Sequence, residues 1–196
     1  MRIIAGQFRS RVLTAPPGLS TRPTSDRLRE TLFNVIAPRI GGATFLDLYA
    51  GSGAVGIEAT SRGADRVTFV ERDPVALRIL RANLERLHIT EGFRINAGSV
   101  KVFLQKRSAN AGPKPVPHDV VFLDPPYDAA EEYAATLGLL GGTCAAHLAP
   151  GALVIAEHRR KQPLEGHYGS LRRTRLLEQG DAALSFYAAE DGVDEG

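Results

Sequence analysis

Residues 45–56, FLDLYAGSGAVG, constrain the fold most, because a run of strand-forming residues passes directly into a glycine-rich turn. Gly51, Gly53 and Gly56 have the spacing G-x-G-x-x-G, and glycines let the backbone reverse sharply and approach a ligand with no Cβ in between. A helix that begins after such a turn points its free N–H groups at the same place. The stretch therefore predicts a strand, a turn and a helix around a nucleotide-like ligand.

Strand and helix patterns alternate regularly after this turn. We expect strands at 44–49, 66–71, 93–97 and 118–124 with helices between them, and an antiparallel hairpin around Gly180 and Asp181. Such alternation is typical of a parallel, doubly wound sheet whose ligands bind at the carboxyl ends of the strands. The sequence therefore predicts an α/β fold with a mostly parallel, seven-stranded sheet and an antiparallel C-terminal hairpin.

Residues 1–40 precede this alternation. The segment RIIAGQFRSRVL mixes apolar and basic residues and predicts a small β-hairpin. A helix is expected over residues 26–37, with Thr24 or Ser25 as its cap and Pro38 as its end. We therefore divide the chain into an N-terminal extension, a main domain and an acidic tail that we expect to be disordered: 1–40, 41–189 and 190–196.

Basic residues are unevenly placed on a chain whose net charge is only +2. Residues 1–39 contain seven arginines and two acids, and a second group lies near the C-terminal hairpin: Arg159, Arg160, Lys161, Arg172, Arg173 and Arg175. Two basic groups on a nearly neutral chain indicate a polyanionic partner that contacts particular faces.

Composition argues against several other classes of protein. No stretch approaches the roughly twenty apolar residues of a membrane span, and the start of the chain lacks the apolar run of a signal peptide, so we expect a cytoplasmic protein. Cys144 is the one cysteine, which rules out an internal disulfide, and the five histidines lack metal-ligand spacing. We therefore expect neither a metal nor a membrane partner.

The glycine turn alone leaves two cofactors open. Glu71 follows Gly51 by twenty residues, where a dinucleotide site places its ribose-binding acid, so NAD and S-adenosylmethionine are both candidates. Asp47 inside the first strand and the later motif DPPY at 124–127 are similar to features of S-adenosylmethionine-dependent methyltransferases. These two features favour methyl transfer.

The DPPY motif suits an exocyclic amine as the methyl acceptor. The lone pair of such a nitrogen is delocalised, so hydrogen bonds from its N–H groups to Asp124 and to the carbonyl of Pro125 would favour the pyramidal nitrogen of the transition state. Pro125 and Pro126 stiffen the loop, and Tyr127 offers a flat face on which an unstacked base can lie.

The chain from Met1 to about Ala188 resembles the RsmD-type bacterial methyltransferases, which modify N(2) of a guanine in 16S ribosomal RNA. The resemblance lies in MRIIAGQFRSRVL, TRPTSDRLRETLFN, FLDLYAGSGAVGIEATSRGA, FVERD, FLDPPY and GDAALSFY. It implies a Rossmann-like class I methyltransferase fold, S-adenosylmethionine as donor and S-adenosylhomocysteine as product. It also implies a monomer that acts on 16S rRNA within the 30S subunit or its assembly intermediates.

Three groups of site residues follow from the motifs and the resemblance. The target base is expected at Asp124, Pro125, Pro126 and Tyr127. The cofactor is expected at Asp47, Tyr49, Ala50, Gly51, Ser52, Gly53, Glu71, Arg72, Gly98, Ser99 and Val100. RNA is expected at Arg9, Arg11, Arg22, Arg27, Arg29 and Asn34. Relatives more often have an acid where this chain has Gly98 and Ser99, so Ser99 and backbone groups are expected to meet the adenine.

Three other functions share parts of this pattern. A DNA adenine-N(6) methyltransferase also uses DPPY, although 196 residues leave little room for a domain that reads base edges. An RNA-binding assembly factor would not need the intact glycine turn and acids. An NAD-dependent oxidoreductase would use the glycine turn and Glu71 but has no use for DPPY.

Overall fold

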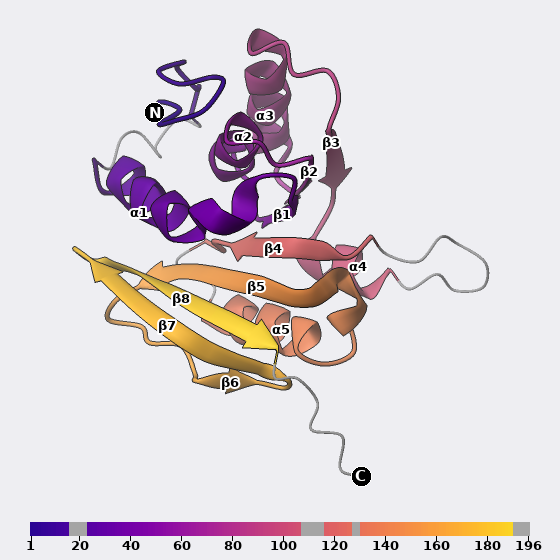
Figure 1. Cartoon of the computed structure of the whole chain (residues 1–196). Coiled ribbons are helices and arrows are strands. Elements are labelled where there is room, and N and C mark those ends of the chain that lie inside the picture. The colour runs from indigo at the N-terminus through magenta and orange to yellow at the C-terminus, as the bar shows by residue number, and fades with distance from the viewer. Residues whose placement is uncertain (16–22, 107–115, 127–129, 190–196) are drawn as a thin grey trace.

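The computed structural model describes residues 1–15, 23–106, 116–126 and 130–189 (Figure 1). The predictions for Arg22, Tyr127 and the tail 190–196 lie outside these ranges. The helices are α1 (Pro23–Ile40), α2 (Ala54–Ser61), α3 (Pro74–Arg86), α4 (Val100–Gln105) and α5 (Ala130–Leu140), with a 3₁₀ turn at Ala145–His147. The strands are β1 (Thr44–Leu48), β2 (Arg66–Glu71), β3 (Phe93–Ala97), β4 (His118–Leu123), β5 (Leu148–Arg159), β6 (His167–Tyr168), β7 (Leu171–Gln179) and β8 (Ala182–Ala189).

All eight strands form one sheet in the order β3-β2-β1-β4-β5-β8-β7-β6. The pairs from β3 to β5 are parallel, whereas β8, β7 and β6 add antiparallel pairs at the other end. The predicted fold class is therefore confirmed, with one strand more than expected. The additional strand, β6, has two residues and pairs only with the start of β7, too short a ladder to leave a pattern in the sequence.

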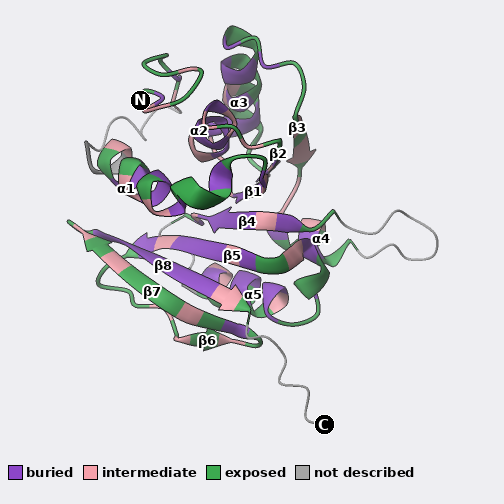
Figure 2. Ribbon diagram, viewed as in Figure 1, coloured by how far each residue is buried: buried purple, intermediate pink, exposed green. Residues whose placement is uncertain are grey.

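Two apolar cores cover the two faces of the sheet, because successive side chains of a strand point to opposite sides. Phe45 of β1 packs with α1, α2 and α3, whereas its neighbour Leu46 packs with α4 and α5. The same alternation assigns Phe122 to the first core and Leu123 to the second. Figure 2 shows the result, with buried residues along the central strands and on the inner sides of the helices.

The chain changes direction across the sheet between β1 and β4. Helix α2 connects β1 to β2, which pairs with one side of β1, and β4 pairs with the other side of β1. Leu48 and Leu123, the last residues of β1 and β4, are paired, so the segments that follow both strands leave the sheet at the same edge. Open parallel sheets bind ligands at such a switch point.

Helix α1 differs from its prediction at both ends. It begins at Pro23, so Thr24 and Ser25 lie in its first turn rather than before it, and it continues through Pro38 to Ile40. Pro38 is tolerated because it lies in the last turn, where its missing N–H removes a single hydrogen bond to an exposed part of the helix. The described helices include none that is long and apolar enough to cross a bilayer.

The N-terminal segment, residues 1–15, has one antiparallel bridge, between Arg2 and Val12, in place of the predicted pair of strands. Several of its backbone groups bind α2 instead of a partner strand. Glu58, which is fully buried in α2, accepts hydrogen bonds from Ile4 N–H at 2.8 Å and from Ala5 N–H at 3.0 Å. Backbone hydrogen bonds also cross the segment, from Ile3 N–H to Arg11, from Ser10 N–H to Ile3 and from Leu13 N–H to Met1. The segment therefore keeps a short hairpin, which packs on the helices of the main domain.

Candidate functional site

The glycine turn between β1 and α2 has the left-handed backbone that its sequence predicts. Gly51 has φ +57° and Gly53 has φ +80°, and Tyr49, which is not a glycine, has φ +62°. At Gly53 a Cβ would lie 2.2 Å from Leu80 Cδ1, so glycine is required both for its φ and for the close approach of α3. A tyrosine in this conformation is strained, and such strain gathers at functional sites.

Glu71 at the end of β2 fixes the position of this turn. One carboxylate oxygen accepts from Gly51 N–H at 2.8 Å, and the other accepts from the N–H groups of Arg72 and Asp73, each at 2.7 Å. Asp73 in turn caps α3 by accepting from Ala76 N–H. One acid therefore holds the first glycine of the turn beside the carboxyl end of β2.

Two further acids face the same space from β1 and β4. Burial raises the pKa of Asp47 to about 7; a hydrogen bond from Gly56 N–H lowers it, and the negative charges of Asp124 and Glu71 raise it again. Burial likewise raises the pKa of Asp124 to about 7. Because both carboxyls are desolvated and close to other acids, a cation placed among them would favour their ionised forms.

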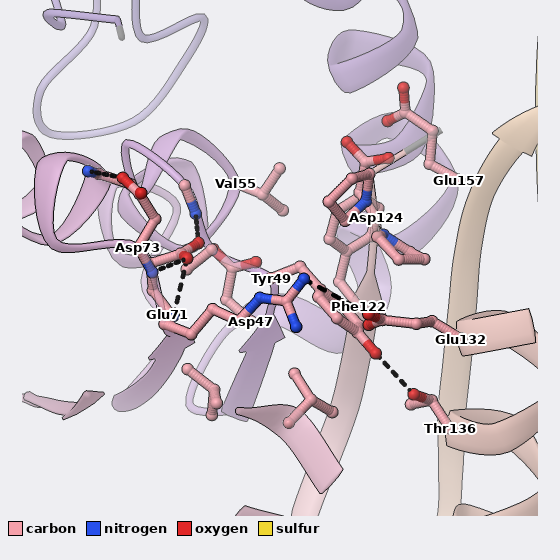
Figure 3. A pocket seen from close by; sticks show the side chains of 18 of the residues that line it. Asp47, Tyr49, Val55, Glu71, Asp73, Phe122, Asp124, Glu132, Thr136 and Glu157 are labelled. Atoms are coloured by element: carbon pink, nitrogen blue, oxygen red, sulfur yellow. Dashed lines mark hydrogen bonds and ion pairs between the residues drawn. The ribbon is translucent and has the colours of Figure 1, made fainter. Parts of the chain in front are cut away.

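Side chains that follow β1 and β2 meet side chains of α5 across the same space. Tyr49 hydroxyl and Thr136 hydroxyl are 2.8 Å apart, and Arg72 Nη2 lies 3.6 Å from Glu132 Oε1 (Figure 3). Burial raises the pKa of Tyr49 above its usual range, so it is a neutral phenol at physiological pH. These contacts join the strand ends to the helix that follows DPPY.

A cavity of about 860 Å³ collects these groups at the carboxyl edge of the sheet. Figure 3 shows Glu71 and Asp73 on one side, Asp124 and Glu157 on the other, and Asp47 and Tyr49 between them. The volume lies within the range of roughly 300–1,000 Å³ that is usual for small-molecule sites. Beside Gly51 an added Cβ would find nothing nearer than 4.0 Å, so the backbone of the turn is open to a ligand.

The lining brings together most of the residues predicted for the cofactor and the base. It includes Asp47, Tyr49, Ala50, Gly51, Ser52, Glu71, Arg72, Gly98, Ser99, Val100, Asp124, Pro125 and Pro126. Gly53 is the exception among the cofactor residues, because it packs against α3 beneath the turn. Ser99 caps α4 by accepting from Val102 N–H at 3.3 Å, so its hydroxyl oxygen is partly engaged.

Several lining residues were not predicted. Met1 and Ala15 come from the N-terminal segment, Glu132 and Thr136 from α5, and Glu157 from β5. No motif surrounds these residues, and they reach the cavity only because α5 and the N-terminal segment fold over the sheet edge. Sequence spacing alone offered no signal for them.

The residues predicted to contact RNA occupy different environments. Arg9, Arg11, Arg27 and Asn34 are exposed. Arg29 is 5% exposed and lines the cavity, where its guanidinium donates to Asp26 at 2.9 Å and to the carbonyl of Arg2. It lies inside the protein rather than on the outer face of α1.

The second basic group does not form one surface. Arg159 ends β5 at the cavity edge, where it pairs with Ala182 at the start of β8, whereas Arg172 pairs with Ala188 near the other end of β8. Arg159 and Arg172 therefore lie near opposite ends of β8. Among the described residues, no cluster of histidine, cysteine or acidic side chains has the arrangement of a metal site.

Comparison with known proteins shows the family to which this chain belongs. The family model described as "Conserved hypothetical protein 95" matches residues 1–188. "Ribosomal RNA small subunit methyltransferase D" of Haemophilus influenzae is 39% identical over 170 residues, 84% of this chain and 81% of the relative. The protein of the same name from Escherichia coli K12 is 43% identical over 127 residues, 65% of this chain and 60% of the relative.

A solved structure agrees with these matches. The structure of yhhF from Escherichia coli has a TM-score of 0.82 at 35% identity and covers 97% of this chain and 98% of its own. The match spans the N-terminal segment, the glycine turn and DPPY alike. The chain therefore belongs to the family described as "Conserved hypothetical protein 95", the RsmD-type methyltransferases.

Proposed function

We propose that this protein transfers a methyl group from S-adenosylmethionine to the exocyclic N(2) amine of a guanine in small-subunit ribosomal RNA. One observation supports this most strongly: the glycine turn after β1 and the proline pair after β4 line the same cavity at the switch point of the sheet. Donor and acceptor must be aligned within one closed space for an in-line displacement. The names of the relatives from Haemophilus influenzae and Escherichia coli support ribosomal RNA as the substrate.

The cofactor fits the acids and the open turn on one side of the cavity. Glu71 would accept hydrogen bonds from the ribose hydroxyls with the lone pairs that its three backbone contacts leave. Asp47 lies deeper, near the position expected for the sulfonium end. S-Adenosylmethionine, when bound, supplies an activated methyl group. Its positive charge suits a space lined by Asp47, Glu71 and Asp124.

The target amine fits the other side of the cavity. Asp124 and the carbonyl of Pro125 would each accept one N–H of the guanine amine and so favour a pyramidal nitrogen. The Asp124 carboxylate, which would already accept one N–H of the amine, would also take the proton that the amine releases. Tyr127 would provide the stacking surface for a base that has left its helix.

RNA would approach over the N-terminal segment and α1. Arg9, Arg11 and Arg27 are exposed and carry the charge for phosphate contacts, with Asn34 on the same helix as Arg27 and Arg22 preceding it. Such contacts position the RNA without reading its sequence. We expect the protein to act as a monomer in the cytoplasm, on 30S subunits or their assembly intermediates.

Incubation with labelled S-adenosylmethionine and methyl-deficient 30S subunits tests the proposal. We expect label in 16S rRNA, and nuclease digestion should return it as N(2)-methylguanosine. Asp124→Ala should remove turnover while it leaves affinity for 30S subunits within about threefold, whereas Glu91→Gln, an exposed acid remote from DPPY, should behave as wild type. Label in DNA or protein but not in rRNA would overturn the proposal, and label as N(6)-methyladenine in DNA would support the alternative adenine methyltransferase.

A further inference from the structure

Asn83 of α3 joins the glycine turn to the N-terminal segment. Its side chain is fully buried, and its amide nitrogen donates to the carbonyls of Ser52 and Thr14, each at 3.0 Å. Its amide oxygen accepts from Thr14 N–H at 2.9 Å. Both amide protons and the carbonyl oxygen are used, so the side chain fits in one orientation: a flipped amide would direct N–H groups at Thr14 N–H.

Both partners of Asn83 lie beside the cavity. Ser52 stands between Gly51 and Gly53 and lines the cavity itself. Thr14 precedes Ala15, which also lines the cavity, as does Met1, whose carbonyl accepts from Leu13 N–H at 3.0 Å. The N-terminal segment therefore forms part of the cavity lining, and Asn83 is one of the groups that hold its end there.

Arg86 of α3 also contacts the end of the segment, at the carbonyl of Val12 and the hydroxyl of Thr14, and the other side-chain contacts of the segment go to parts of the protein away from the turn. Glu58 binds Ile4 and Ala5, and Ser61 hydroxyl accepts from Phe8 N–H at 3.0 Å and donates to the carbonyl of Ala5 at 2.6 Å. These contacts fix the middle of the segment on α2. Asn83 contacts its end, next to the cavity, and contacts the glycine turn at the same time.

We propose that Asn83 is a positioning residue that couples cofactor binding at the glycine turn to RNA binding at the N-terminal segment. A ligand that orders the turn stabilises the position of Ser52, and through the Asn83 amide it stabilises Thr14 and the segment that carries Arg9 and Arg11. Coupling is reciprocal, so RNA on the segment must tighten cofactor binding by the same factor. Both halves rest on the proposed function, the cofactor half on its donor and the RNA half on its substrate, and a wild type that does not bind S-adenosylhomocysteine would count against the proposed function itself.

Two substitutions separate the partners of Asn83. Asn83→Asp keeps the size of the side chain and the acceptor for Thr14 N–H, but it puts a carboxylate oxygen against the carbonyls of Ser52 and Thr14. Thr14→Pro removes the N–H from which Asn83 accepts, together with the hydroxyl that Arg86 contacts, and leaves the contact to Ser52 in place. Thr14→Val, which loses the hydroxyl alone, controls for that second loss and should bind as wild type. Glu85→Gln, an exposed change on the same helix, is the control.

The first measurement is S-adenosylhomocysteine binding to the free protein by calorimetry. We expect Asn83→Asp to weaken binding at least tenfold and Thr14→Pro to weaken it threefold or more, with Glu85→Gln unchanged. Unchanged binding in Thr14→Pro would overturn the proposal, because the segment would then have no influence on the turn. Thr14→Pro also keeps the test decisive if Asn83→Asp does not fold.

The second measurement is binding to methyl-deficient 30S subunits with and without S-adenosylhomocysteine. Wild type should bind 30S subunits at least fivefold more tightly when S-adenosylhomocysteine is present. In both variants the affinity for 30S subunits should no longer depend on S-adenosylhomocysteine, even where the affinity measured without it is that of wild type. A merely structural role would lower both affinities and leave the ratio intact. If wild type binds 30S subunits equally well with and without S-adenosylhomocysteine, the coupling is overturned. If wild type does not bind 30S subunits at all, the result counts against the proposed function, and the calorimetric result decides the cofactor half.

Discussion

Substitution of Glu71 by glutamine should weaken cofactor binding by disturbing the turn. Glutamine can keep one oxygen for the N–H groups of Arg72 and Asp73, but its amide nitrogen then faces Gly51 N–H, donor against donor. Hydrogen bonds to a charged group contribute about 1.5–3 kcal/mol, and Glu71 is half-exposed, so solvent screening reduces the loss to about 2 kcal/mol. At about 1.4 kcal/mol for each factor of ten, this loss corresponds to roughly a 30-fold change in an equilibrium constant.

Calorimetric titration with S-adenosylhomocysteine measures this change without RNA or turnover. We expect the Kd of S-adenosylhomocysteine to rise at least tenfold in Glu71→Gln. Part of the remaining free-energy loss should appear as a lower free energy of unfolding in urea. Glu85→Gln, which removes an exposed charge on α3, should bind as wild type. If Glu71→Gln binds within twofold of wild type and unfolds at the same urea concentration, the carboxylate does not hold the turn and the reasoning fails.

Three further outcomes follow from the same cavity. The pKa of Asp47 and of Asp124 is raised to about 7 from an unfolded value near 3.8, so the free energy of unfolding should fall as pH rises from about 4 to 7 and level off above 7. Affinity for the sulfonium cofactor should rise as pH approaches 7; urea titrations and calorimetry at pH 5 and 7 check both signs, and Asp47→Asn should reduce both changes. Gly53→Ala should cost about 2 kcal/mol or more, because it combines φ +80° with a Cβ 2.2 Å from Leu80, whereas Gly151→Ala, at φ +70° in open space, should cost about 1 kcal/mol; equal costs in thermal unfolding would contradict the role of close packing. Tyr49→Phe should lose the bond to Thr136 and about 0.5–1.5 kcal/mol of stability, and an unchanged unfolding midpoint would show that this bond contributes nothing.

The N-terminal segment shows most clearly where sequence reasoning stopped. Its mixture of apolar and basic residues predicted a hairpin, but Glu58 and Ser61 of α2 take up its backbone N–H groups, and the pair of strands reduces to one bridge. The resemblance placed Arg29 in the block that faces RNA and the mouth of the site, and the structure buries it beside Asp26 in the cavity lining. Both differences arise from contacts between residues distant in the sequence.

The sequence by itself determined the parts that depend on local chemistry. Glycine spacing after an apolar run predicted the left-handed turn, and regular alternation predicted parallel strands, which must bring Asp47, Glu71 and Asp124 to one edge of the sheet. Only the tertiary structure decided which distant groups complete the cavity. Residues of α5 and of the N-terminal segment reach it, and the Asn83 amide binds the carbonyl of Ser52 beside it. These contacts join parts of the chain that are distant in the sequence, and no periodicity records contacts of that range.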